Sequence, residues 1–115
     1  MANTFKVVTK AGVTSADVIY TVAGSTTTVV LGIMLGNTTT SQVTATVTLS
    51  SDTSNRAGAN NEANQDVELV TNAPIPSGSS LELLAGNKVV METTDVLKLT
   101  ASGATDIALS IMEIT

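Results

Sequence analysis

Apolar and polar residues alternate with a period of two through much of the chain. The clearest example covers residues 43–50, where Val43, Ala45, Val47 and Leu49 alternate with Thr44, Thr46, Thr48 and Ser50. Successive side chains of a strand point to opposite faces, whereas a helix would scatter these valines around its circumference. The segment therefore predicts a strand with one apolar face and one hydroxyl face.

A second strong signal covers residues 26–37, which are apolar on both faces of a predicted strand. Such a run is typical of a strand in the middle of a packed sheet, and Gly32 within it indicates a bulge or a close backbone approach. Shorter runs predict further strands at 5–9, 17–23, 67–75, 81–83, 89–91, from 97 onward and at 106–115. Pro74 and Pro76 either end the strand at 67–75 or keep it at a sheet edge.

Two of these strands have a less regular pattern. In the strand predicted at 17–23, we expect Val18, Tyr20 and Val22 on one face, with Ile19 and Thr21 on the other. In the strand predicted at 106–115, Ile107, Leu109 and Ile111 keep the period of two, while Met112 and Ile114 fall on the other face. The last strand is therefore predicted either to contain a bulge or to be apolar on both sides.

Turn signals separate the predicted strands at intervals of about 8–12 residues. They are found at 11–17, Gly24-Ser25, Ser77–Ser79, Gly86-Asn87, Thr93–Asp95 and 102–105. No window shows the 3.6-residue period of an amphipathic helix. We therefore expect an all-β fold, a single antiparallel β-sandwich of jelly-roll or Greek-key type with about eight or nine strands and little helix.

Residues 51–66 read SDTSNRAGANNEANQD and contain no large apolar side chain. Such a segment cannot bury enough apolar surface to offset the entropy lost when it is ordered. We therefore expect residues 1–115 to form one β-sandwich domain with a flexible polar loop at 51–66.

Composition supports strands and narrows the class of partner. Threonine and valine, both β-branched, supply 20 and 14 of the 115 residues. A net charge of −5 with five basic residues argues against nucleic acid, because so few cations cannot neutralise a path of phosphates. The longest apolar stretch, 29–35, is too short to span a bilayer, so we expect no membrane partner.

Histidine and cysteine are both missing from the chain. This excludes the common zinc sites, the Cys–His pair, the Ser–His–Asp triad and disulfides, and it leaves the compartment open. The first residues, MANTFKVVTK, lack the apolar core of a signal peptide, so we expect synthesis in a cytoplasm. A Ser–Lys dyad would need Lys6, Lys10, Lys88 or Lys98, but no G-x-S-x-G motif occurs, and we expect these lysines to be solvated or to guard strand edges.

Carboxylates near the predicted turns are the remaining candidates for catalysis. Glu82, Glu92 and Asp95 offer a pair of the kind that cleaves glycosidic bonds, although acids beside turns usually bond backbone amides. Sugar sites also favour aromatic platforms, and only Phe5 and Tyr20 are aromatic. We expect these acids to serve their turns.

Two other motifs are weak. Asp52 and Ser54 do not complete a calcium loop, and Arg56 would repel a cation there. Asn37-Thr38-Thr39 matches the glycosylation sequon, which is short and common. We therefore predict no catalytic residue, no cofactor-binding or metal-binding residue and no cofactor.

The run from 67 to 115, which contains NAPIPSGSSLELLAGNKVVMETTDVLKLT, resembles the C-terminal half of small structural proteins of tailed bacteriophages. The segment TVAGSTTTVVLGIMLGN resembles a strand pair in the N-terminal half of the same proteins. The resemblance covers most of the chain apart from 51–66. Its matching positions are Pro76, Gly78, Gly86, Asp95 and Glu113.

The resemblance implies a non-enzymatic β-sandwich in the virion. We expect a capsid decoration (cement) or accessory surface subunit, a homo-oligomer that binds the major capsid protein or other virion structural proteins. The alternatives are a neck or tail subunit and a receptor- or carbohydrate-binding module. Ile19, Ile33 and Met34 are candidates for a symmetric interface, and the competing interpretation is that they fill the second sheet of the sandwich.

Overall fold

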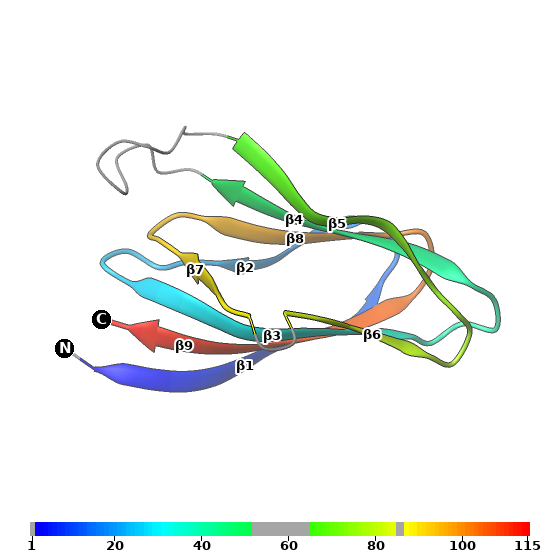
Figure 1. Cartoon of the computed structure of the whole chain (residues 1–115), viewed down its shortest axis with the longest axis horizontal. Helices are drawn as coiled ribbons and strands as arrows, with labels where there is room; N and C mark the ends of the chain where they lie inside the picture. The colour runs from blue at the N-terminus through cyan, green and yellow to red at the C-terminus, as the bar shows by residue number, and fades with distance from the viewer. Residues whose placement is uncertain (1, 52–64, 85–86) are drawn as a thin grey trace.

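The computed structural model describes residues 2–51, 65–84 and 87–115. Within these ranges the chain forms nine strands and no helix, arranged as two antiparallel sheets stacked face to face (Figure 1). The strands are β1 (Asn3–Val13), β2 (Ala16–Thr21), β3 (Thr27–Asn37), β4 (Val43–Ser51), β5 (Gln65–Ile75), β6 (Ser80–Leu83), β7 (Val89–Met91), β8 (Val96–Ala101) and β9 (Thr105–Ile114). The predicted all-β antiparallel sandwich is confirmed.

The two sheets differ in how their strands are ordered. The five-stranded sheet has the order β1-β9-β3-β6, with β7 also paired to β3, and the four-stranded sheet has the order β2-β8-β4-β5. The predicted central position of β3 is confirmed, because β9 lies on one side of it and β6 and β7 on the other. The bulge is also confirmed, since the register of β3 against β9 shifts between Val30 and Gly32. β5 lies at a sheet edge and ends at Ile75, as the prolines predicted.

Side chains that point between the sheets form one apolar core. β4 contributes Val43, Ala45 and Val47, all of which are buried, so the predicted alternation is confirmed for residues 43–47. Beyond them Thr48 is buried as well, and Leu49 is half-buried against the core. The other core residues are Val13, Val22, Val30, Ile33, Leu35, Ile75, Met91, Leu97, Leu99, Ala101, Ile107, Leu109 and Ile111. Both sheets thus present an apolar inner face to each other.

The facing predicted for residues 17–23 is correct for Tyr20, Thr21 and Val22 and wrong for Val18 and Ile19. The register of β2 against β8 shifts between Val18 and Tyr20, so that Val18 lies beside Lys98 and Tyr20 beside Leu97. Val18 is 50% exposed, whereas Leu97 is in the core. An extra residue at a bulge reverses the facing of everything beyond it, and a count with period two does not detect that residue.

The predicted turn at 11–17 is shorter in the structure. β1 continues to Val13, and β2 begins after only two further residues. Gly12 has a φ of +67°, and the register of β1 against β9 shifts between Lys10 and Val13. A bulge bends its strand, so here it directs the chain from one sheet to the other.

The other two open predictions concern β9 and the polar loop. β9 pairs with β1 without interruption from Ile107 to Ile114, so it is a strand with apolar residues on both sides and contains no bulge against β1. Both ends of the predicted loop belong to strands, because Ser51 ends β4 and Gln65 begins β5. Its remaining residues, including Asp52, Ser54 and Arg56, lie outside the described residues.

Asn37 closes one end of the sandwich. Its Nδ2 donates to the carbonyl oxygens of Ser41 at 2.8 Å and Ile75 at 2.9 Å, and its Oδ1 accepts from the Thr39 backbone N–H and hydroxyl, both at 2.8 Å. The bond to Ile75 joins β3 to β5, and therefore one sheet to the other. Because the amide is buried and fully bonded, the sequon has no free acceptor nitrogen in this fold.

Candidate functional site

Four polar side chains meet between the sheets near the chain termini. Tyr20 Oη of β2 donates to Glu113 Oε2 at 2.6 Å and lies 2.8 Å from Thr28 Oγ1. Lys6 Nζ forms an ion pair with Glu113 Oε1 at 2.7 Å. Tyr20 belongs to the four-stranded sheet and the other three residues to the five-stranded sheet, so this inter-sheet cluster ties the sheets together.

The inter-sheet cluster has shifted protonation equilibria. Burial and the hydrogen bond to Glu113 raise the pKa of Tyr20 to about 12. The bonds from Lys6 and Tyr20 lower the pKa of Glu113 below its usual 4.5. At neutral pH Tyr20 is therefore a neutral donor and Glu113 an ionised acceptor, each held by its neighbours. The arrangement stabilises the fold and leaves no activated base or nucleophile.

The carboxylates near the turns do not form an acid pair. Asp95 is fully buried, and its carboxylate accepts the backbone N–H of Glu92 at 3.0 Å, which is the turn function expected for it. Glu82 lies on β6, away from that turn. Within 2–51, 65–84 and 87–115, no three acidic, histidine or cysteine residues come close enough to hold a metal ion.

Two of the four lysines lie on β1, an edge strand. Lys6 pairs with Glu113, and Lys10 pairs with Asp17 of β2 at 3.0 Å. Charged side chains on an edge strand hinder pairing with a further strand. A Ser–Lys dyad would need a serine beside the lysine ammonium group. The two ion pairs bring a carboxylate, and not a serine, to Lys6 and Lys10.

The outer face of the five-stranded sheet carries a continuous apolar surface. The register places Phe5 beside Met112, Met112 beside Val29 and Val29 beside Val90, so one apolar row crosses β1, β9, β3 and β7. The chain neighbours Thr28, Val30 and Ile111 are buried, which shows that this row points outward.

Val7 on β1 and Met34 on β3 extend the outward row along the sheet. Phe5 is 72% exposed, Val7 64%, Val90 56% and Met34 49%. We call the six residues Phe5, Val7, Val29, Met34, Val90 and Met112 the apolar face. Large side chains at such exposure on one surface are typical of a protein interaction site.

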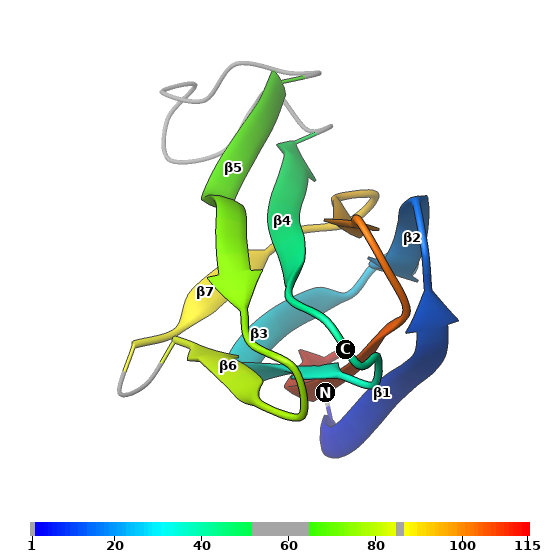
Figure 2. The same ribbon diagram turned by 90° about the vertical axis from the view of Figure 1, so that its right-hand side faces the viewer.

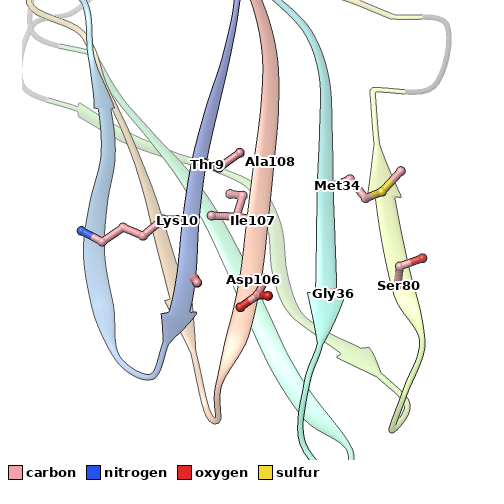
Figure 3. A pocket seen from close by; sticks show the side chains of 9 residues that line it. Thr9, Lys10, Met34, Gly36, Ser80, Asp106, Ile107 and Ala108 are labelled. Carbon is pink, nitrogen blue, oxygen red and sulfur yellow. The ribbon is translucent and has the colours of Figure 1, made fainter.

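Two hollows lie on either side of Met34. The first, of about 390 Å³, is lined by Thr9, Gly36, Asp106 and Ala108 among others, and Figure 3 shows it from the side of β1, β9 and β3. The second, of about 300 Å³, has Gly32, Glu82, Leu84 and Ser110 in its lining. They form because β9 and β3 place glycine, alanine and serine outward at these positions, so little fills the space above the backbone.

The outer face of the four-stranded sheet has a different chemistry. Its outward residues on β4 are Thr44, Thr46, Thr48 and Ser50, beside Lys98 and Thr100 on β8 and Asp66 and Glu68 on β5. The hydroxyls are bonded locally: Thr46 Oγ1 accepts from the Asn72 N–H at 2.9 Å, and Ser50 Oγ donates to Asp66 Oδ1 at 2.5 Å. We call these eight residues the hydroxyl face.

The three residues named as interface candidates are separated by the structure. Ile33 belongs to the core, Ile19 is half-buried against it, and Met34 lies on the apolar face. Sequence reasoning missed Phe5, Val7 and Val90 as parts of one surface. The pattern of the last strand does predict that Met112 lies opposite the core residues Ile107, Leu109 and Ile111.

Comparison with known proteins shows similarity in fold only. No known family model matches the chain, and no curated protein matches it. The solved structure reported as "Bacillus endospore appendages form a novel family of disulfide-linked pili" is similar over 99% of this chain and 87% of that chain, with a TM-score of 0.51 and 16% identity. A chain of the infectious bursal disease virus (IBDV) T13 particle matches over 96% of this chain and 35% of its own length, with a TM-score of 0.46 and 9% identity. At such identities the first match supports the sandwich fold.

A search of the described residues for membrane spans finds no helix that is long and apolar enough to cross a bilayer.

Proposed function

We propose that this protein is a non-enzymatic structural subunit that builds a larger assembly by protein–protein contacts. The observation that carries the proposal is the apolar face, a row of apolar side chains on the outside of a sandwich whose core is already complete without them. Water contact at such a face is unfavourable, and burial against another protein removes it.

The fold supports this class of function. If β6 and β7 count as one interrupted strand beside β3, each sheet has four strands in the order expected of a jelly roll. Jelly rolls occur in viral capsid proteins. The pilus subunit with the similar fold is described as disulfide-linked, but this chain has no cysteine, so its own assembly would rest on noncovalent contacts.

The particle we propose is the virion of a tailed bacteriophage, with the chain as a capsid decoration subunit bound to the major capsid protein or to other virion proteins. The resemblance of residues 67–115 to phage structural proteins supports this choice. Charged residues make up only 13% of the chain, which limits repulsion between many closely spaced copies. A neck or tail subunit is the alternative with the same chemistry.

A carbohydrate-binding module is the alternative from another class. It is less well supported, because Tyr20 is half-buried with its hydroxyl bonded to Glu113, which leaves Phe5 as the exposed aromatic ring of the chain. We also propose that residues 1–115 form one domain and that no residue is catalytic and no cofactor or metal is bound.

Quantitative mass spectrometry of purified particles tests the proposal. A decoration subunit should be present in many copies, in a fixed ratio to the major capsid protein, whereas a neck or tail subunit should be present in few. Absence from particles would contradict the virion proposal. A rise in the melting temperature with a sugar would instead favour the carbohydrate-binding alternative, because a ligand stabilises the state that binds it.

A further inference from the structure

We propose that the apolar face is covered by the same face of a second copy of this chain, in a two-fold symmetric, antiparallel arrangement. This inference rests on the proposed function, since it names one partner in the assembly.

The face has a raised half and a hollow half. Val7, Ser110 and Gly32 form its middle row. On one side of this row lie the large residues Phe5, Met112, Val29 and Val90. On the other side Met34 lies between the two hollows, and Thr9 and Ala108 line the first of them. Raised and hollow parts on one surface are the feature that lets a surface pack against itself.

A two-fold axis along the middle row makes the two halves meet. It turns the second copy so that its raised half lies over the hollow half of the first. Met112 of one copy then lies over Ala108 of the other, and Phe5 over Thr9, at the hollow of about 390 Å³. Val7 of one copy lies near Val7 of the other, because both are close to the axis.

The acidic residues lie at the margin of the face. Glu82 belongs to β6, at the edge of the sheet, and Asp106 accepts the backbone N–H of Gly12 at 2.9 Å. Neither acid lies on the middle row, so the two-fold axis does not bring either of them against its own copy. Glu82 of one copy lies near Val90 of the other at the rim of the contact, where its carboxylate stays in water.

The exposure of the face is typical of a contact surface. Phe5, Val7, Met34 and Val90 are each about half exposed or more. Large apolar side chains gathered on one face at such exposure mark an interaction site.

Sedimentation velocity over a range of concentrations tests the inference with a matched pair of variants. Val7→Glu places a charge near the axis, and Val18→Glu places the same charge on a half-exposed valine of β2, beside Lys98 and outside the apolar face. The wild type and Val18→Glu should form dimers. Val7→Glu should associate at least about tenfold more weakly, with an unchanged circular dichroism spectrum.

Single cysteines supply a second measurement, made simple by a chain that has none of its own. Under mild oxidation, Val7→Cys should cross-link to a covalent dimer and Val18→Cys should not. The inference is overturned if the wild type is monomeric, if Val18→Glu weakens association as much as Val7→Glu, or if Val18→Cys cross-links as readily as Val7→Cys. A monomeric chain that is nevertheless abundant in particles would overturn the inference and leave the proposed function standing. A dimer that is absent from particles would support the inference and contradict the proposed virion function.

Discussion

The two outer faces of this sandwich are built by the same fold rules and carry opposite chemistry. β4 and β5 lie side by side in the four-stranded sheet (Figure 2). The outward positions of β4 are the hydroxyl residues Thr44, Thr46, Thr48 and Ser50, of which Thr48 is buried. On β1, β9, β3 and β7 the outward positions form the apolar face. The inward positions of both sheets contribute apolar side chains to one shared core.

This difference separates the features that folding requires from those that it does not require. Folding requires the inner faces to be apolar, because they bury each other. It requires nothing of the outer faces except solubility, which the hydroxyl face provides. The apolar content of the other face is therefore unexplained by folding and is best explained by a partner.

The largest expected effect comes from a charge placed on the inward side of β4. Val47→Asp should unfold the protein, with a loss of more than about 4 kcal/mol, because it buries an unpaired carboxylate at a position with no exposure. Thr46→Asp, one residue away on the hydroxyl face, should leave the chain folded. Urea unfolding followed by circular dichroism measures both, and the reverse order would mean that the register of β4 is shifted by one residue.

The next effect concerns the amide that holds the sheets together at one end. Asn37→Ala should lower the free energy of unfolding by about 2–3 kcal/mol, because it leaves the buried carbonyl of Ile75 without its donor. Thr38→Ala, which removes one exposed hydrogen bond to Ala104, should cost less than about 1 kcal/mol. Urea unfolding measures both variants. If both lost the same free energy of unfolding, Asn37 would not be important for holding the two sheets together.

The inter-sheet cluster at the other end gives a pH dependence. The raised pKa of Tyr20 stabilises the fold fully below pH 10, and this contribution is lost as the pH rises from 10 towards about 12. The lowered pKa of Glu113 acts in the opposite sense, since its contribution is present above pH 4.5 and is lost as the pH falls through the folded-state pKa. Tyr20→Phe should cost about 1 kcal/mol at neutral pH and should flatten the alkaline loss.

Thermal unfolding between pH 3 and pH 12, repeated with Glu113→Gln, tests both ends of this profile. Glu113→Gln should flatten the acid side and also weaken the alkaline loss, because Tyr20 loses its carboxylate acceptor. An unchanged profile in both variants would show that the inter-sheet cluster does not couple to folding.

How far the sequence predicts this molecule depends on how local each feature is. The alternation of residues 43–50 predicts the facing of 43–47 correctly, but it does not predict that Thr48 is buried. Gly32 predicts the bulge in β3, because glycine marks it. The bulge between Val18 and Tyr20 has no such residue, and it reverses the predicted facing of Val18 and Ile19. Local pattern therefore predicts strands well and their interruptions only where the residue type reveals them.

The apolar face could not be predicted in the same way. Phe5, Val29, Val90 and Met112 are far apart in the chain, and only the register between β1, β9, β3 and β7 makes them neighbours. Each of these four residues, taken alone, has the pattern of an ordinary strand residue and does not indicate a shared surface. The surface exists only after the strands have paired, so its evidence is in topology and not in any window of sequence.

The smallest predicted effect separates stability from assembly on that face. A Cβ added at Gly36 meets no atom within 4 Å, and its φ is not in the left-handed region, so Gly36→Ala should stabilise the monomer by about 0.5 kcal/mol. The same methyl group narrows the hollow that receives the second copy and should weaken the dimer. Gly24→Ala, also in open space but remote from the hollow, should stabilise the monomer alone. If chemical unfolding and sedimentation found the two variants alike in both properties, the hollow would have no part in assembly, and the contrast between the two faces would concern solubility only.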